Sequence, residues 1–332
     1  THLPEAFLAA MRAKLGDDAI AFFEEHNNPA PVSVRINPFK YAPVFADAEK
    51  IPWATNARFL PERISFTLDP LFHAGCYYVQ EASSMFLEQA MRQTTDLSKT
   101  IRVLDLCAAP GGKSTHIQSL ISKNSLLVSN EVIRSRVSVL KDNMVKWGSA
   151  NVVITNNDPK DFARLPNYFD VIVVDAPCSG SGLFRRDPEA ISEWSENNVQ
   201  LCAQRQQRIL ADVWPALKKD GILIYSTCSY SKQEDEEIVD WLKNEFFVTP
   251  LTLTVDPGWG ITITDAGYRF WPDKIKGEGF FIACLQKKED RVHVAPKIKK
   301  RAEQVSDKER TIINNWVKPG DLSFFKHEET VY

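Results

Sequence analysis

Two cysteines follow the ends of predicted strands and precede loops of small residues. Cys178 lies in residues 175–182 (DAPCSGSG), and Cys228 lies in the run YSTCSYS. Both strand ends meet the same sheet edge as a third small-residue loop, residues 103–114 (VLDLCAAPGGKS). Most free cysteines are small buried hydrophobes. Two of them converging on one ligand loop form the strongest chemical pattern in the sequence, because a thiolate there can act as a nucleophile.

The small-residue loop connects a strand to a helix. Its glycines let the backbone approach a ligand, and a helix N-terminus presents free N–H groups. A phosphate-binding loop would need glycine where Cys107 stands, and the dinucleotide fingerprint needs more glycines than Gly111 and Gly112. A strand ending in Asp105 and followed by such a loop suits a nucleoside-bearing ligand without a polyphosphate. The alternative is a tight turn that binds no ligand.

Acidic residues follow the next two predicted strands. Glu131 stands where an acid can accept hydrogen bonds from ribose hydroxyls, and Asp158 follows the third strand. With Asp105, three successive strand ends carry an acid at the edge where open α/β sheets bind ligands. The alternative for each acid is a helix cap or a solvated loop residue.

The elements that would position these residues alternate between strands and helices from residue 101 onward, which predicts βαβ units and a parallel sheet. Several strands are continuous apolar runs, as expected when both faces are covered. A final pair of apolar runs, near Ile261 and at residues 279–285, is expected to add an antiparallel hairpin. The expected strands are 101–106, 126–130, 152–155, 169–175 and 222–227, and the expected helices are 114–122, 134–147, 197–218 and 233–244.

The segments on either side differ in composition. Residues 1–100 are expected to form a smaller α+β region, with helices at 5–25 and 81–91 and a strand in PVSVRINPF. Residues 101–286 form the expected catalytic domain. Residues 287–301 carry seven Lys/Arg against two acids and are expected to be a linker or basic arm. A short helix near 308–316 follows, and residues 287–332 are expected to begin a further domain.

Composition limits the possibilities. The 332 residues include 40 Lys+Arg against 43 Asp+Glu, which alone favours a small-molecule enzyme over a nucleic-acid binder. The near balance of charge over the whole chain conceals local differences, because the basic arm is offset by acidic stretches such as residues 233–240. No apolar run reaches the roughly 18 residues of a membrane helix, and no secretory signal is present, so we expect a cytoplasmic protein without membrane contact. The six cysteines lack zinc-ligand spacing, so neither a metal nor disulfides are expected.

Taken together, the motifs resemble the NOL1/NOP2/Sun family of S-adenosylmethionine-dependent RNA (cytosine-C5) methyltransferases. The resemblance runs from about Pro31 to Leu285. The segments QEASSM, RRDP and EGFF make it most similar to the bacterial 16S ribosomal RNA methyltransferase F group. It implies a Rossmann-like class I methyltransferase domain, with a PUA-type domain after the catalytic core. The motifs that carry it are residues 107–113 (CAAPGGK), Asn130-Glu131, residues 175–180 (DAPCSG) and 226–228 (STC).

The resemblance implies a role for each motif. Cys228 would be the nucleophile that adds to cytosine C6, and Cys178 would assist product release. Asp175 would hydrogen-bond the base edge and border the cofactor, and Lys113 would favour the thiolate. Glu131 would hold the ribose, Asp158 the adenine, and Arg136 would order the wall between them. The residues that would cradle S-adenosylmethionine are Cys107, Ala108, Ala109, Pro110, Gly111, Gly112 and Lys113.

The implied partner is 16S rRNA or the 30S subunit, bound by a monomer. A paired cytosine is unreachable, so the target must be single-stranded or flipped out. Arg185 and Arg186 are the first candidates for phosphate contact and the basic arm is the second. Alternative functions are a catalytically silent ribosome-assembly factor, a tRNA methyltransferase, and a small-molecule or DNA methyltransferase, although the last leaves the second cysteine without a role.

Overall fold

The computed structural model describes residues 3–41, 44–289, 303–317, 322–327 and 329–331. The chain divides into two compact units, Thr1–His293 and Val294–Tyr332. The predicted regions 1–100 and 101–286 therefore lie within one compact unit. Over the described residues, no helix is both long enough and apolar enough to cross a membrane.

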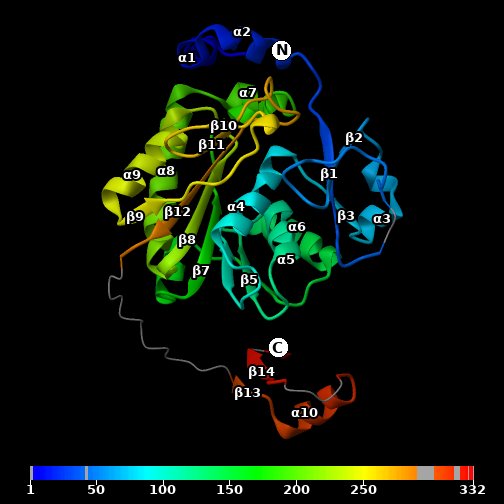
Figure 1. The fold of residues 1–332 in the computed structure, drawn as a ribbon. Helices are drawn as coiled ribbons and strands as arrows, with labels where there is room; N and C mark the ends of the chain where they lie inside the picture. Colours follow the sequence, from blue (N-terminus) through cyan, green and yellow to red (C-terminus); the bar gives the residue numbers. More distant parts are fainter. Residues whose placement is uncertain (1–2, 42–43, 290–302, 318–321, 328, 332) are drawn as a thin grey trace. The chain divides into compact units, whose positions relative to one another are not determined.

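A mixed sheet forms the centre of the larger unit (Figure 1), in the strand order β10-β11-β12-β8-β7-β4-β5-β6, with β9 beside β12. Strands β8, β7, β4, β5 and β6 are parallel, whereas β9 to β12 are antiparallel to their neighbours. The predicted α/β fold with an added antiparallel segment is confirmed. The strands are β4 Arg102–Asp105, β5 Leu126–Asn130, β6 Val152–Thr155, β7 Phe169–Asp175, β8 Leu217–Thr227, β9 Val248–Pro250, β10 Thr262–Ile263, β11 Tyr268–Phe270 and β12 Phe280–Lys287.

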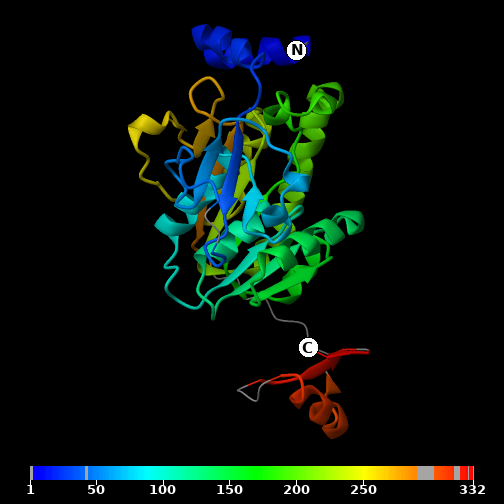
Figure 2. The same cartoon turned by 90° about the vertical axis from the view of Figure 1, so that its right-hand side faces the viewer.

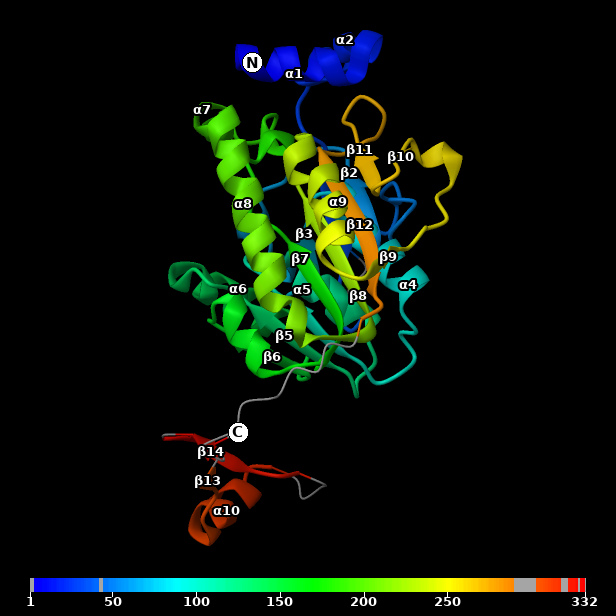
Figure 3. The same cartoon turned by 90° about the vertical axis from the view of Figure 1, so that its left-hand side faces the viewer.

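Helices cover both faces of this sheet (Figure 3). Neighbouring strand residues alternate between two apolar clusters: Val103 packs with the helices α4 to α6, and Leu104 packs with α8 and α9. This alternation explains the continuous apolar runs. The helix predicted at 197–218 is too long, because α8 ends at Val213 before Pro215 and the chain then enters β8. The helices are α4 Leu87–Thr94, α5 Gly112–Leu120, α6 Arg134–Trp147, α7 Pro188–Glu193, α8 Glu196–Val213 and α9 Glu236–Glu245.

The N-terminal region adds short helices and a small antiparallel sheet, β2-β1-β3 (Figure 2). The single helix predicted at 5–25 is wrong, since Gly16 takes a positive φ of 57° and a 3-10 turn separates two helices. Trp53 is 2% exposed and packs in the core, whereas Phe39 and Tyr41 are 55% and 101% exposed. The elements are α1 Glu5–Leu15, α2 Ala19–Glu25, β1 Val32–Ile36, β2 Ala57–Leu60, α3 Pro70–His73 and β3 Tyr77–Val79.

Buried polar contacts join the small sheet to the helices of the large one. The guanidinium of Arg35 in β1 donates to Gln80 Oε1 at 2.9 Å, to Thr115 Oγ1 at 2.5 Å and to the carbonyl of Gly112 at 3.1 Å. It also stacks 4.5 Å from the ring centre of Trp147 in α6. Arg35 is 2% exposed, so the N-terminal sheet holds the first turn of α5 through a buried cation.

The smaller unit contains a three-stranded antiparallel sheet, β13-β14-β15, and the helix α10. Its capping box, Ser306 with Glu309, defines the start of α10. The predicted basic arm falls largely on residues 290–302, outside the described residues. Its first member, Lys287, ends β12 and is 1% exposed, donating to the carbonyls of Trp214 and Leu217. The elements are β13 Glu303–Gln304, α10 Asp307–Asn314, β14 Phe325–His327 and β15 Thr330–Val331.

The buried pair of His116 in α5 and Glu88 in α4 predicts acid sensitivity. The two side chains are 3.1 Å apart, and burial lowers the pKa of His116 to about 4. The unfolded chain binds this proton near pH 6.5, so folding is progressively weakened as the pH falls from about 6.5 to about 4. His116→Gln keeps a donor to Glu88 but does not titrate. Between about pH 7 and about pH 5, wild type should lose about 2 kcal/mol more unfolding free energy than the variant, measured by urea denaturation. If the unfolding free energies of wild type and His116→Gln fall equally with pH, the buried histidine is not the source of the acid sensitivity.

Candidate active site

The two cysteines meet because the strands before them are paired in register. Asp175 of β7 lies opposite Ser226 of β8 in the parallel ladder. Cys178 and Cys228 follow these residues, and their Sγ atoms lie 3.2 Å apart. The hydrogen bond to Cys228, together with burial, raises the pKa of Cys178 well above its ordinary value. Cys178 is therefore held as a thiol at neutral pH.

The loops that carry the cysteines touch through backbone. The N–H of Gly182 donates to the carbonyl of Cys228 at 2.8 Å. A Cβ atom on Gly182 would lie 2.5 Å from the carbonyl oxygen of Gly279 and 2.8 Å from that of Cys228. Glycine is needed here for close approach rather than for a positive φ.

A cavity of about 270 Å³ opens beside Cys228. Its wall combines the predicted ligand loop with segments from the N-terminal region and from β12. Such a concave site with several polar groups is typical of a ligand pocket. The residues used below line it: Tyr78, Gln80, Glu81, Cys107, Ala108, Ala109, Pro110, Gly112, Lys113, Asp175, Arg186, Cys228, Glu278 and Phe280.

Asp175 and Lys113 form an ion pair inside this cavity. Lys113 Nζ lies 2.7 Å from Asp175 Oδ2, and Ser226 Oγ donates to Asp175 Oδ1 at 2.7 Å. Burial by itself lowers the pKa of Lys113, but the carboxylate of Asp175 outweighs it and the pKa is raised. Lys113 is thus a fixed cation paired with Asp175, and it lines the same cavity as Cys228.

The predicted ligand loop is held from outside by two side chains of α6. Arg136 Nη2 donates to the carbonyl of Ala109 at 2.7 Å, and Asn143 Nδ2 donates to that of Pro110 at 2.8 Å. Gly111 has a φ of 111°, which residues with a Cβ rarely adopt. Burial raises the pKa of Cys107, which lines the cavity as a neutral thiol. The loop is therefore shaped before any ligand arrives.

Asp105 lies at the end of β4 and is fully buried. Ser114 Oγ donates to its Oδ2 at 2.6 Å, whereas Oδ1 has no hydrogen-bond partner among the described residues. Burial raises the pKa of Asp105 to about 7. Perturbed carboxyl groups of this kind concentrate at functional sites.

The other two predicted acids take different positions. Glu131, at the end of β5, is 3% exposed; its carboxylate accepts the N–H of Ile133 at 2.8 Å and lies 3.5 Å from Arg136. Asp158 caps the 3-10 helix Pro159–Arg164 and accepts the N–H of Lys160 at 3.2 Å. Neither lines the cavity, and Asp158 has the capping role weighed as the alternative.

The two predicted phosphate-binding arginines differ. The side chain of Arg185 is 1% exposed and pairs with Glu25 at 2.5 Å and with Glu278 at 2.9 Å. The expectation that Arg185 contacts RNA is therefore wrong, since its charge is already neutralised inside the protein. Arg186 is exposed and borders both the cavity beside Cys228 and a neighbouring one of about 910 Å³.

Sequence reasoning missed several residues of the site. Gln80, Glu81 and Glu278 belong to QEASSM and EGFF, which were noticed only as points of resemblance. Burial raises the pKa of Glu278 to about 7 despite its contact with Arg185. Glu234, which reaches both cysteine loops, lies in an acidic run without a local signal for burial. Over the described residues, no cluster of three or more His, Cys, Asp or Glu could hold a metal ion.

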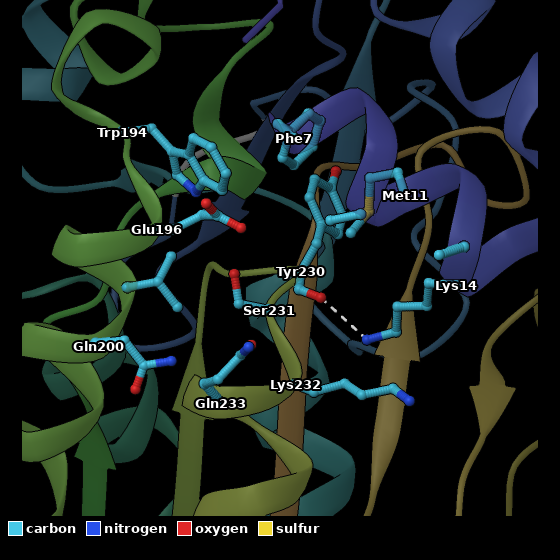
Figure 4. Close-up of a pocket in the computed structure, with 13 residues that line it drawn as sticks. Phe7, Met11, Lys14, Trp194, Glu196, Gln200, Tyr230, Ser231, Lys232 and Gln233 are labelled. Atoms are coloured by element: carbon cyan, nitrogen blue, oxygen red, sulfur yellow. Dashed lines mark hydrogen bonds between the residues drawn. The ribbon is translucent and has the colours of Figure 1, made fainter. Parts of the chain in front are cut away.

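A separate cavity of about 300 Å³ lies behind the Cys228 loop (Figure 4). It is bounded by α1, the start of α8 and the chain after Cys228. Lys14 donates to the carbonyl of Tyr230 at 3.0 Å, and burial lowers its pKa to about 8. The N-terminal helix therefore supports the loop that carries the second cysteine.

Comparison with known proteins places this site in a family. Residues 93–286 match the family described as 16S rRNA methyltransferase RsmB/F, and residues 3–82 match the N-terminal domain of 16S rRNA methyltransferase RsmF. A relative from Pectobacterium carotovorum, the ribosomal RNA small subunit methyltransferase F, is 36% identical over 312 residues. The match covers 86% of this chain and 63% of that protein.

Solved structures agree on the fold. A methyltransferase homolog protein from Pyrococcus horikoshii has a TM-score of 0.72 at 28% identity, covering 86% of this chain and 95% of that one. NSun6 from Pyrococcus horikoshii with SFG has a TM-score of 0.73 at 17% identity, covering 86% and 99%. Since one family match alone spans more than half of the sequence, the chain belongs to the 16S rRNA methyltransferase RsmB/F family, as its motifs predicted.

Proposed function

We propose that this chain transfers a methyl group from S-adenosylmethionine to C5 of a cytosine in 16S rRNA. The observation that carries the proposal is the pair of cysteine sulfurs, 3.2 Å apart, beside a cavity lined by the ligand loop. Membership of the RsmB/F family supports both the methyl donor and the RNA substrate. The chain spans less than two thirds of the relative from Pectobacterium, so its own activity requires a direct test.

The residues present suit S-adenosylmethionine, which supplies an electrophilic methyl group. The loop of residues 107–113 offers small side chains and the start of α5, and buried Asp105 retains an unpartnered oxygen beneath it. Glu131 is held at the end of β5 by Arg136, where its carboxylate can bind ribose hydroxyls. Asp158, which follows β6 and caps the 3-10 helix Pro159–Arg164, would face the adenine. No polyphosphate cradle is present in the motif, which agrees with a nucleoside ligand.

The chemistry begins at Cys228. Cytosine C5 is a poor nucleophile, and addition of the Cys228 thiolate to C6 turns C5 into an enamine-like carbon that can accept the methyl group. Asp175 borders the same cavity, where it can hydrogen-bond the base edge while Lys113 holds its carboxylate in place.

Cys178 acts in the second half of the reaction. After methylation a base must take up the C5 proton; the electron pair of that C–H bond re-forms the C5–C6 double bond, the bond between C6 and Cys228 Sγ breaks, and Cys228 leaves as the thiolate. Cys228 lines the cavity whereas Cys178 does not, and the Cys178 sulfur lies 3.2 Å from that of Cys228. This difference supports assigning attack to Cys228 and release to Cys178.

The RNA would approach from the larger neighbouring cavity. That cavity of about 910 Å³ shares Gln80, Glu81 and Arg186 with the catalytic one, so the two adjoin. Arg186 stands at the junction, and Arg63 and Lys276 line the outer part. A flipped cytosine in the inner cavity would leave its backbone near Arg186. We propose that the N-terminal region, which supplies much of the outer wall, binds RNA.

Alternatives remain testable. A silent assembly factor would bind RNA and cofactor without needing two adjacent cysteines beside a cavity that Asp175 and Cys228 line. A tRNA methyltransferase would use the same chemistry, so the choice of substrate separates it. Tritium transfer to 30S subunits, free 16S rRNA and tRNA, compared side by side, decides among these functions.

Changing each cysteine separates their roles. Cys228→Ala should abolish methyl transfer, because no adduct at C6 can form. Cys178→Ala should accumulate a covalent RNA–protein adduct that survives denaturation and appears as a shifted band on a gel. Cys76→Ala, which changes a buried thiol outside the cavity, is the control. A trapped adduct in Cys228→Ala would reverse the two roles, and full activity in that variant would refute the mechanism.

Arg186→Ala should weaken RNA binding without altering cofactor affinity. Losing one phosphate contact should reduce the slope of log K against log[salt] by about 0.7 for a single strand. The matched control is Arg205→Ala, which removes an exposed arginine of α8 outside both cavities. Filter binding over a range of salt concentrations measures the slope, and equal slopes for wild type and Arg186→Ala would contradict the contact.

A further inference from the structure

A single buried carboxylate reaches both cysteine loops. Glu234 lies in the 3-10 helix Lys232–Glu234 after β8 and is 0% exposed. Its Oε1 accepts the backbone N–H of Ser179 at 2.7 Å, and its Oε2 accepts Ser179 Oγ at 2.6 Å and Ser229 Oγ at 2.5 Å. Ser179 directly follows Cys178, and Ser229 directly follows Cys228.

Hydrogen-bond donors from other elements surround Glu234. Gln206 Nε2 of α8 donates to Oε1 at 3.4 Å and to the carbonyl of Pro177 at 3.0 Å. Tyr225 of β8 donates its hydroxyl to the backbone carbonyl of Glu234 at 2.5 Å. A carboxylate can accept several such bonds at once, and a buried charge persists only when it is paired or well hydrogen-bonded.

We propose that Glu234 is a positioning residue that sets the separation of Cys178 and Cys228 by binding the residue after each of them. This inference rests on the proposed roles of the two cysteines in methyl transfer. The pairing of β7 with β8 ends at Asp175 and Ser226, and beyond it the backbone joins the two cysteine loops through the bond from the Gly182 N–H to the Cys228 carbonyl. The Glu234 carboxylate adds a second link between these loops, at the residues that directly follow the two cysteines.

The same carboxylate has an electrostatic effect. Its negative charge contributes to the raised pKa of Cys178, after the hydrogen bond to Cys228, burial and the charge of Cys228 itself. Glu234 therefore also helps to keep Cys178 protonated while Cys228 attacks. Neither Ser179 nor Ser229 lines the catalytic cavity, so their contacts with Glu234 affect the sulfurs rather than the cofactor.

Kinetics of two variants test the positioning role. Glu234→Gln removes the charge, whereas the double change Ser179→Ala/Ser229→Ala removes both hydroxyl contacts and leaves the charge. Each should lower kcat roughly 10- to 100-fold, with KM for S-adenosylmethionine unchanged. Glu237→Gln, an exposed glutamate three positions along, is the matched control. Thermal melting shows that each variant is folded; if Glu234→Gln does not fold, the serine pair decides the question.

A second measurement needs neither RNA nor cofactor. Diamide oxidises two adjacent thiols to a disulfide and takes up their two electrons and two protons. In wild type the Cys178 and Cys228 thiols should close rapidly, giving a linked peptide pair by mass spectrometry. In Ser179→Ala/Ser229→Ala, closure should be markedly slower, because the sulfurs spend less time in contact. Equal closure rates, or an unchanged kcat in a folded serine variant, would overturn the proposal.

The two measurements distinguish the possible failures. If wild type methylates no RNA but the serine variant slows disulfide closure, the proposed function fails while the positioning of the sulfurs stands. If wild type methylates RNA and the serine variant changes neither kcat nor closure, the positioning role alone fails.

Discussion

The site depends on the parallel register of β7 and β8. Because Asp175 lies opposite Ser226, the chain leaves the two strands at the same level, and each cysteine follows within three residues. A shift of one residue would turn Asp175 away from Ser226 and move one sulfur to the other face. The register is itself fixed by alternating side chains that fill two different apolar clusters, so packing on both faces of the sheet sets the geometry of the chemistry.

Charged groups in and around the cavity are arranged in pairs. Lys113 offsets Asp175, Arg136 lies against Glu131, and Arg185 offsets Glu278. Pairing lowers the penalty of burying these groups and fixes their directions before any ligand binds. Arg186 and Arg185 are neighbours in sequence, yet one is exposed at the mouth of the cavity and the other supports its wall from inside.

The sequence predicted the strands well where local signals were complete. The bounds of β5, β6 and β7 agree with the prediction, since each is an apolar run ended by polar residues. Long-range contacts could not be predicted from the sequence. Arg185 pairs with Glu25 across 160 positions, and no local pattern shows that Arg185 is buried while Arg186 is exposed. The sequence did not separate Glu234 from the acidic residues around it. Whether a carboxylate is buried depends on hydrogen-bond donors from other segments, here Ser179 and Ser229.

The contact of Arg35 with α5 has a consequence for how such proteins can evolve. Two acceptors in the first turn of α5, the carbonyl of Gly112 and Oγ1 of Thr115, take hydrogen bonds from a strand that precedes the sheet by some 65 residues. Leaving buried acceptors unsatisfied costs about 1–3 kcal/mol each. Recombination that exchanged the first hundred residues for those of a distant homologue would break this contact unless an equivalent arginine arrived with them. The two segments should therefore be inherited together, despite matching two separate family descriptions.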